Sequence, residues 1–310
     1  MKQVFSLLLL LILFSACNRK VDPNWLNADD VVVAFDGTFK PIMDELEQTF
    51  AKKHVEAVMK PVFTTEDSVL RLFLNDSLRL CVATRALTAD EKDIVQSHSL
   101  RVMQSPIATD ALALIVNKNS GDSLITLDEV KGIVSGKITR WEQLKNSRRK
   151  GELKMVFDAS GSSTVRYMKD SLNHGKDIAG NVYAQGSNEA VIDLVKDDPT
   201  IIGVLGANWL KAPTDTAALS SFAHLDYKVM KVSRFTGANE AYYRPYQYYI
   251  GTGDYPLVRT IYVITSDPRQ RSMVRNFYFF LKGDQGQRII CNHSQMLPYQ
   301  QVTVRSVEVH

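Results

Sequence analysis

Short apolar strands alternate with amphipathic helices along most of this 310-residue chain. The first unit consists of the apolar run Val31 to Phe35, the turn Asp36-Gly37-Thr38 and a helix predicted over residues 41–53. Further buried-strand patterns, with helical patterns between most of them, lie at residues 56–63, 80–84, 111–117, 154–158 and 201–206. This alternation predicts an α/β fold with mostly parallel sheets flanked by helices. Because a chain of this length exceeds what one compact core usually supports, we expect two lobes.

Candidate ligand residues follow two of these strands, at the point where each strand ends. Gly37, Thr38 and Phe39 come after the first strand, and Thr84 and Arg85 end another. Ligands collect beyond the carboxyl ends of parallel strands. A helix that begins there presents unpaired N–H groups and a partial positive charge, which favour a small anion.

The amino terminus has the pattern of a lipoprotein signal peptide. Lys2 precedes an apolar run from Val4 to Phe14, and small residues stand directly before Cys17. The run is shorter than the roughly 20 residues of a spanning helix. We therefore expect a signal peptide at 1–16, lipid attachment at Cys17 and a polar tether at 17–28 that holds the folded part near a membrane. An ordinary secretory signal with an incidental cysteine is the alternative.

Composition excludes several functional classes. The formal net charge of +3 is too small to indicate a nucleic-acid partner. Zinc-protease, Walker and nucleophile-elbow motifs are missing from the sequence, and the histidines lack metal-ligand spacing. We therefore expect neither an enzyme nor a cofactor. Cys81 and Cys291 form either one disulfide or two buried thiols, since sequence gives no distance between them.

Several segments resemble the periplasmic phosphate-binding proteins of ABC transporters, in the order in which that family has them. The segment 124–141 resembles a strand, a helix and a turn that ends in Gly136-Lys137-Ile138-Thr139-Arg140-Trp141. Further similar segments are 111–117, 201–206, 255–262 and 283–290. The resemblance covers the chain from about Val31 to its end.

This resemblance implies a two-lobed type II periplasmic-binding-protein fold, each lobe a mixed, mostly parallel sheet flanked by helices. Lobe 1 is expected from 29–110 plus 250–310, and lobe 2 from 111–249, with the return crossover within 229–250. It also implies capture of inorganic phosphate in the interlobe cleft and delivery to a membrane permease of an ABC transporter. The location implied is the periplasmic side of the cell envelope, with the lipid on Cys17 as the membrane anchor.

The resemblance further implies which residues bind the anion. Ser162, Ser163 and Thr164 stand where the family has Ser-Gly-Thr at a helix start, and Thr38 and Phe39 match its first-lobe Thr-Phe. Hydroxyl and N–H groups at a helix start suit an anion independently of the resemblance. The alternative is that these residues only cap helices, as Ser and Thr often do.

Two charges depart from the family pattern. Asp158 stands where the family has an anion-binding Arg, and Arg85 stands where many relatives carry an acidic residue. We hypothesise that Asp158 accepts the proton that phosphate keeps and sulfate lacks, and that Arg85 is the cationic partner. The alternatives are that Asp158 caps the following loop and that Arg85 forms a structural ion pair with Glu66 or Glu91. Arg166, in the first turn after Thr164, either adds charge or is simply exposed.

Three rival functions follow from the same residues. The first is a binder of another oxyanion, such as tungstate or molybdate, or of a small organic anion. The second is a sensory or adhesive lipoprotein that keeps the fold without feeding a transporter. The third is a hydrolase that uses Ser162 or Ser163, which the absence of an identifiable base at suitable spacing disfavours.

Overall fold

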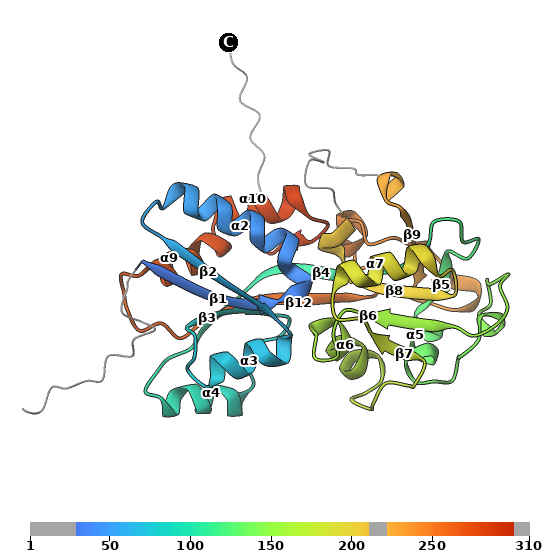
Figure 1. The fold of residues 1–310 in the computed structure, drawn as a ribbon, viewed down its shortest axis with the longest axis horizontal. Helices are drawn as coiled ribbons and strands as arrows, with labels where there is room; N and C mark the ends of the chain where they lie inside the picture. Colours follow the sequence, from blue (N-terminus) through green and yellow to red (C-terminus); the bar gives the residue numbers. More distant parts are fainter. Residues whose placement is uncertain (1–28, 211–221, 301–310) are drawn as a thin grey trace, which may run out of the picture.

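The computed structural model describes residues 29–210 and 222–300, which form two lobes joined by long strands (Figure 1). Lobe 1 contains β1 Asp30–Asp36, β2 Val58–Thr64, β3 Leu80–Ala83 and β12 Val258–Thr265. Its helices are α2 Lys40–Lys53, α3 Glu66–Leu74, α4 Ala89–Ser97, α9 Met273–Lys282 and α10 Asp284–His293. A 3-10 turn, Gly37–Phe39, connects β1 to α2.

The lobe 1 sheet is buried on both faces. β1 lies between β2 and β3 and is parallel to both, whereas β12 is antiparallel to β3. Side chains of β1 alternate between two apolar clusters: Val33 and Phe35 pack with α2 and α9, and Ala34 packs with Val69 and Phe73 of α3. Burial on both faces explains why β1 reads as a continuous apolar run.

One long strand, β4 Met103–Asn117, runs through both lobes (Figure 1). Its first part pairs with β12 and its second part with β8 Ile201–Gly206, antiparallel in both cases. The sequence predicted only 111–117 as a strand. The amino-terminal extension was missed because polar and apolar residues mix there: this half of β4 is only partly buried, whereas residues 110–116 are fully buried.

Lobe 2 repeats the sheet arrangement on a smaller scale. β8 pairs in parallel with β6 Lys154–Phe157, which pairs in parallel with β7 Val182–Ala184. The remaining elements are β5 Leu124–Thr126, α5 Leu127–Val134, α6 Ser163–Tyr167, a π-helical segment Met168–Leu172, α7 Asn188–Asp197, β9 Tyr227–Val229, β10 Lys231–Ser233, β11 Tyr242–Tyr243 and α8 Gln247–Gly251. A short strand, β13 Leu297–Pro298, pairs with β4. The predicted α/β fold with two mixed-sheet lobes is confirmed.

The segment 124–141 folds as its pattern predicted, into a strand, a helix and a turn. Thr126 forms a capping box with Glu129 at the start of α5. Gly136 ends the helix region with φ of +76°, which favours glycine. A Cβ on Gly132 would lie 2.7 Å from the Ile138 side chain, so the turn folds back closely onto the helix. Trp141 is fully buried and donates its indole N–H to the carbonyl of Thr200.

The return of the chain to lobe 1 within residues 229–250 stays a prediction. Gln247 Nε2 already donates to the carbonyls of Cys291, Ser294 and Met296, which belong to lobe 1. Ile250, Tyr255 and Leu257 all pack in the lobe 2 core. The Tyr255 hydroxyl donates to the carbonyl of Leu112 at 2.6 Å. We propose that the crossover extends from Gln247 to the start of β12 at Val258, since contacts to both lobes occur along this stretch.

The two cysteines are not joined by a disulfide, but only one matches the prediction of two buried thiols, because Cys291 is half-buried. Cys81 is buried in β3 and packs with the α3 side of the lobe 1 sheet. Cys291 lies in α10, on the other side, and is not disulfide-bonded to it. Burial raises the pKa of the Cys81 thiol, so this side chain behaves as an apolar core residue.

Candidate functional site

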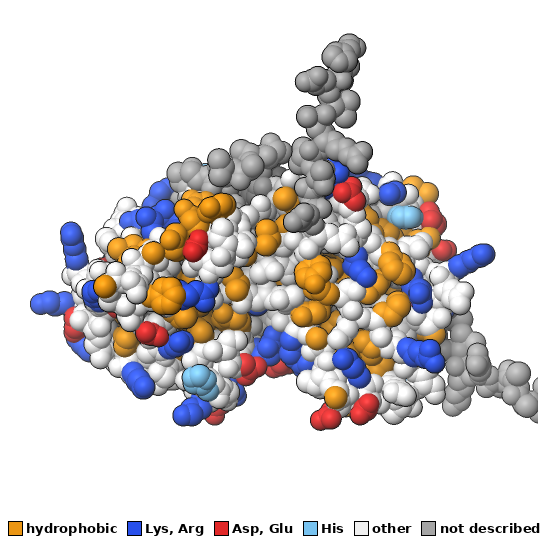
Figure 2. Space-filling view, turned by 180° about the vertical axis from the view of Figure 1, so that it is seen from behind, with side chains coloured by type: hydrophobic (Ala, Val, Ile, Leu, Met, Phe, Trp, Pro, Cys, Tyr) orange, Lys and Arg blue, Asp and Glu red, His pale blue; other side chains and the backbone are white. Residues whose placement is uncertain are grey.

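A pocket opens between the lobes at the carboxyl ends of β1, β2 and β6. It is lined by Asp36, Gly37, Lys40, Phe63, Thr64, Thr65, Asp158, Ala159, Ser162, Gly186, Ser187, Asn188 and Glu189. Seen from behind, the lower outline of the molecule is notched between the two lobes, and basic and acidic side chains gather at this notch (Figure 2). Both lobes therefore contribute to the pocket, as the resemblance implied.

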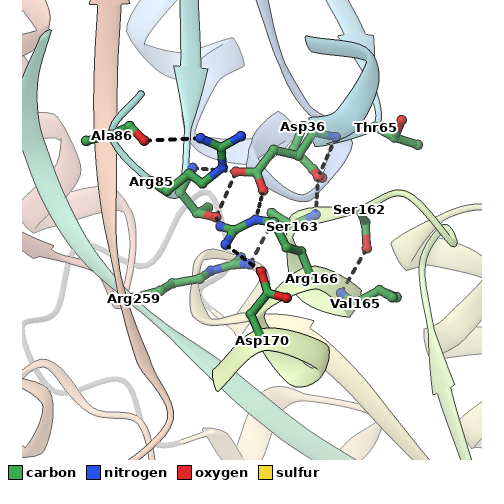
Figure 3. A network of polar contacts seen from close by, with 12 residues as sticks. Asp36, Thr65, Arg85, Ala86, Ser162, Ser163, Val165, Arg166, Asp170 and Arg259 are labelled. Atoms are coloured by element: carbon green, nitrogen blue, oxygen red, sulfur yellow. Dashed lines mark hydrogen bonds and ion pairs between the residues drawn. The ribbon is translucent and has the colours of Figure 1, made fainter. Parts of the chain in front are cut away.

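The carboxylate of Asp36 accepts hydrogen bonds from three backbone amides at the bottom of this pocket. Its Oδ1 atom accepts from Thr38 N at 2.9 Å. Its Oδ2 atom accepts from Glu66 N at 3.2 Å and from Ser163 N at 2.6 Å. Thr38 and Glu66 belong to lobe 1 and Ser163 to lobe 2, so one carboxylate joins the two lobes (Figure 3).

Local sequence explains why these amides are unpaired within their own elements. Each belongs to the first turn of a helical segment, where the N–H groups have no intrahelical partner. Asp36 caps the 3-10 turn, Thr65 caps α3 and Ser162 caps α6 by accepting from Val165 N at 3.3 Å. The capping alternative for Ser162 is thus realised, and it leaves Ser163 N available to an acceptor in the cleft.

Thr38, Ser163 and Thr164 are all fully buried, and the amides of Thr38 and Ser163 meet at the Asp36 carboxylate. The Oγ1 atoms of Thr38 and Thr164 have no hydrogen-bond partner. A buried hydroxyl without a partner is costly, by roughly 1–3 kcal/mol. These two atoms are therefore positioned to gain from a ligand oxygen.

A buried ion pair lies directly behind this group. Arg259 of β12 donates to Asp110 Oδ2 from Nε at 3.0 Å and from Nη2 at 2.8 Å. Its Nη1 atom donates to Ser163 Oγ at 3.0 Å, and its guanidinium lies 5.3 Å from the Phe39 ring centroid. Arg259 thus donates directly to one of the predicted anion residues, Ser163. The ring of Phe39 packs beside the guanidinium and does not line the pocket.

Asp158 faces the pocket from the end of β6. Its Oδ2 atom accepts a long hydrogen bond of 3.5 Å from Asn188 Nδ2, and its Oδ1 atom has no partner although the side chain is only 3% exposed. Burial raises the pKa of Asp158. Burial also raises the pKa of Asp36 to about 6, with repulsion from Asp158 as the next cause. Two acidic groups thus share one largely buried site.

Arg85 is not brought to the pocket. Its Nη1 and Nη2 atoms donate to the two carboxylate oxygens of Glu91, both at 2.7 Å, so the ion-pair alternative is realised. Hydrogen bonding to Glu91 raises the pKa of Arg85. Thr84 lies beside the cleft, but its N–H and hydroxyl donate to Glu66 Oε1.

Arg166 crosses from α6 to lobe 1, where it pairs with the fully buried Glu66 and with the hydroxyl of Thr84 (Figure 3). Burial alone would raise the pKa of Glu66, but the attraction and hydrogen bonds of Arg166 outweigh it, so the pKa lies below its ordinary value. Glu66 is therefore ionised at neutral pH. The sequence named Arg166 as a possible charge for the anion, whereas its geometry makes it a link between the lobes.

Further contacts hold the lobes together. Asn208 Nδ2 and Trp209 Nε1 both donate to the carbonyl of Thr38, at 2.9 and 2.7 Å. Asp67 N donates to the carbonyl of Gly161 at 3.2 Å. With the bonds of Ser163 and Arg166, these contacts describe a closed arrangement of the two lobes.

Sequence reasoning missed Asp36, Asp110 and Arg259 as site residues. Asp36 was read only as part of a turn, although an acidic residue directly after a buried strand is a signal for this edge of a sheet. Arg259 lies in the segment 255–262, which resembles the phosphate-binding family, and it is a single charge in an apolar strand. Such a charge needs a buried partner, and Asp110 is one.

Neither metal binding nor membrane crossing is indicated within residues 29–210 and 222–300. No cluster of three or more metal-ligating His, Cys, Asp or Glu side chains occurs there. None of the helices in this part of the chain is both long and apolar enough to traverse a bilayer. The predicted signal peptide, Cys17 and the tether lie outside the described residues.

Comparison with known proteins gives one family match and consistent relatives. The profile of a family described as "PBP superfamily domain" matches residues 24–284. The chain is 23% identical to Protein SphX of Synechococcus elongatus, over 82% of this chain and 74% of SphX. It is 22% identical to the phosphate-binding protein PstS of Staphylococcus epidermidis, over 81% of this chain and 73% of PstS.

The fold also matches a solved structure. The ABC-type phosphate transport receptor from Vibrio cholerae superposes with a TM-score of 0.64 at 17% identity, over 87% of this chain and all of the receptor chain. At this identity the match shows a common fold.

Proposed function

The chain belongs to the PBP superfamily of solute-binding proteins, and on that premise we propose that it captures inorganic phosphate between its lobes for an ABC transporter. The relatives named above support this choice, since PstS is named a phosphate-binding protein and the Vibrio cholerae structure a phosphate transport receptor. The proposed ligand residues are Gly37, Thr38, Phe39, Ser162, Ser163, Thr164 and Asp158, with Arg259 as the supporting cation. Thr84 and Arg85 are left out because Glu66 and Glu91 occupy their donors.

One observation carries the proposal: three backbone amides from both lobes converge on a single carboxylate. Backbone N–H groups held by the fold in one place form a site for oxyanions, because they donate without carrying charge that must be desolvated. The unpartnered hydroxyls of Thr38 and Thr164 add two more donors. A tetrahedral oxyanion offers enough acceptor atoms for this number of donors.

Asp158 gives the site an acceptor as well as donors. Phosphate keeps a proton near neutral pH and can donate it to the free Oδ1 atom, whereas sulfate has no proton to give. We therefore expect Asp158→Asn to reduce the preference for phosphate over sulfate by about tenfold or more. Calorimetric titration of the purified protein with phosphate, arsenate, sulfate, tungstate and molybdate measures this preference.

The matched control is Glu189→Gln, which changes an exposed carboxylate on the rim of the same pocket. Its selectivity should equal that of the unchanged protein. Unaltered selectivity in Asp158→Asn removes Asp158 from the role of proton acceptor. If the protein binds tungstate or molybdate more tightly than phosphate, that anion and not phosphate is the cargo.

A lipid anchor on Cys17 is the second part of the proposal. Cleavage before Cys17 and acylation of its amino group and thiol would tether the protein to the membrane, on the extracytoplasmic side. Cys17→Ser is expected to move the protein from the membrane fraction to the soluble extracytoplasmic fraction, because a single polar substitution removes the attachment atom. Fractionation followed by detergent-phase partitioning tests this, and membrane retention of the variant would contradict the anchor.

A further inference from the structure

The carboxylate of Asp36 already fills the position where the three backbone amides converge. An Asp that only caps a helix uses its carboxylate on the next turn, as Asp36 Oδ1 does with Thr38 N. The Oδ2 atom makes two additional hydrogen bonds. It accepts from the amide of Glu66 and from the amide of Ser163, which lies 127 residues away in the other lobe. Capping needs neither of these two bonds.

Asp36 also lines the open pocket, whereas three of the predicted anion residues do not. Asp36 lines the pocket together with Gly37, Asp158 and Ser162. Thr38, Ser163 and Thr164 have no exposed surface and do not line it. An anion that enters the pocket therefore meets the carboxylates of Asp36 and Asp158 before it meets the amides of Glu66 and Ser163.

The charges around Asp36 make its carboxylate a weakly held anion. Arg259 of β12 attracts it, but two hydrogen bonds from Asp110 already engage that guanidinium. Asp158, after β6, repels it, and Asp158 Oδ1 has no partner of its own. Further charged groups around this region are Lys40 of α2, Glu189 of α7, and Glu66 and Asp67 of α3. Glu66 is paired with Arg166, and the Asp67 carboxylate lies beside Gly161.

We propose that Asp36 is a tethered anion that holds the lobes closed without cargo and sets affinity and selectivity, because a bound oxyanion must displace its carboxylate from the amides of Glu66 and Ser163. This rests on the proposed function. It identifies Asp36 as a specificity-determining residue that the family resemblance did not imply. Only an oxyanion that makes more bonds than one carboxylate, such as one that also engages Thr38 and Thr164, displaces it at low concentration.

The first test needs no ligand. In phosphate-free protein, the backbone amide resonances of Glu66 and Ser163 should shift together with pH, with a midpoint near the Asp36 pKa of about 6. Asp36→Asn should abolish this shift, because the amide side chain does not titrate. Asp158→Asn should retain it, with a lower midpoint, because a repelling charge has been removed.

The second test is calorimetric titration with inorganic phosphate at pH 8 and pH 5. At pH 8 Asp36→Asn is expected to bind phosphate about tenfold more tightly than the unchanged protein, because one like charge has been removed from the site. At pH 5 the unchanged protein carries a largely neutral Asp36, so the gap between the two should narrow. Asp36→Gly, which removes the side chain, should bind at least as tightly as Asp36→Asn at pH 8.

The outcomes separate this inference from the proposed function. Shifts that depend on Asp36, together with tighter phosphate binding by the variants, support it. Amide resonances that ignore pH, or variants that bind phosphate no more tightly than the unchanged protein, overturn it. Shifts that depend on Asp36 in a protein that binds no phosphate in any variant keep Asp36 on the amides and overturn phosphate as the cargo.

Discussion

Replacing Arg259 with methionine is expected to lower the free energy of unfolding by about 3–5 kcal/mol. The Arg259 side chain is 3% exposed, and it is the ion-pair partner of Asp110, which is fully buried in the strand that joins the lobes. Methionine fills much of the volume but leaves a carboxylate in a low-dielectric interior without its counter-charge. Ser163 also loses the donor to its hydroxyl. Urea unfolding followed by tryptophan fluorescence measures the change.

Two further variants separate the lost charge pair from lost packing. Arg259→Met combined with Asp110→Asn should recover part of the stability, since no uncompensated charge remains and the amide oxygen can still accept from Ala207 N. Arg140→Met removes a solvent-exposed partner of Glu142 and should cost less than about 1 kcal/mol. Equal losses for Arg259→Met and Arg140→Met would show that the buried pair does not hold the lobes' junction.

Replacing Arg166 with methionine is expected to shift the lobes toward an open arrangement. In the closed arrangement this variant leaves Glu66 buried without its partner, whereas opening exposes Glu66 to water. A penalty of about 3 kcal/mol on the closed state corresponds to a change of roughly a hundredfold in the equilibrium between closed and open forms. Small-angle X-ray scattering of phosphate-free protein should show a larger radius of gyration than for the unchanged protein.

The matched control for Arg166 is Arg85→Met. Arg85 also makes a close pair with Glu91, with two hydrogen bonds of 2.7 Å, but both residues belong to lobe 1. Its removal affects local stability and leaves the scattering curve unchanged. Scattering curves that coincide for Arg166→Met and the unchanged protein would contradict a closing role for the Arg166–Glu66 pair.

The local sequence pattern was sufficient to predict most helices and strands and the order in which they occur. The apolar run of β1, the amphipathic α2 and the capping box of α5 each follow from a few neighbouring residues. Segments of the same kind predicted the α/β class and, through the family resemblance, two lobes. Thr38, Ser163 and Thr164 are all fully buried, and their grouping as anion ligands stays a prediction.

Pairing of charges was decided by the tertiary structure. Arg85 and Arg166 both stand near the ends of strands, and the sequence favoured Arg85 as the cation of the site. In the structure Arg85 pairs with Glu91, 6 residues away, and Arg166 pairs with Glu66, 100 residues away. A long, flexible side chain reaches several carboxylates, so its partner depends on distances that only the folded chain defines.

The sequence by itself determined the α/β class, the strand-to-helix turns and most of the polar groups that surround the cleft, because propensity, capping and apolar periodicity act within a few residues. The tertiary structure was needed to show that Asp36 accepts from the amide of Ser163 in the other lobe and that Arg259 pairs with Asp110. These outcomes depend on contacts between residues more than 100 positions apart, for which burial and electrostatics in the assembled core choose the partner.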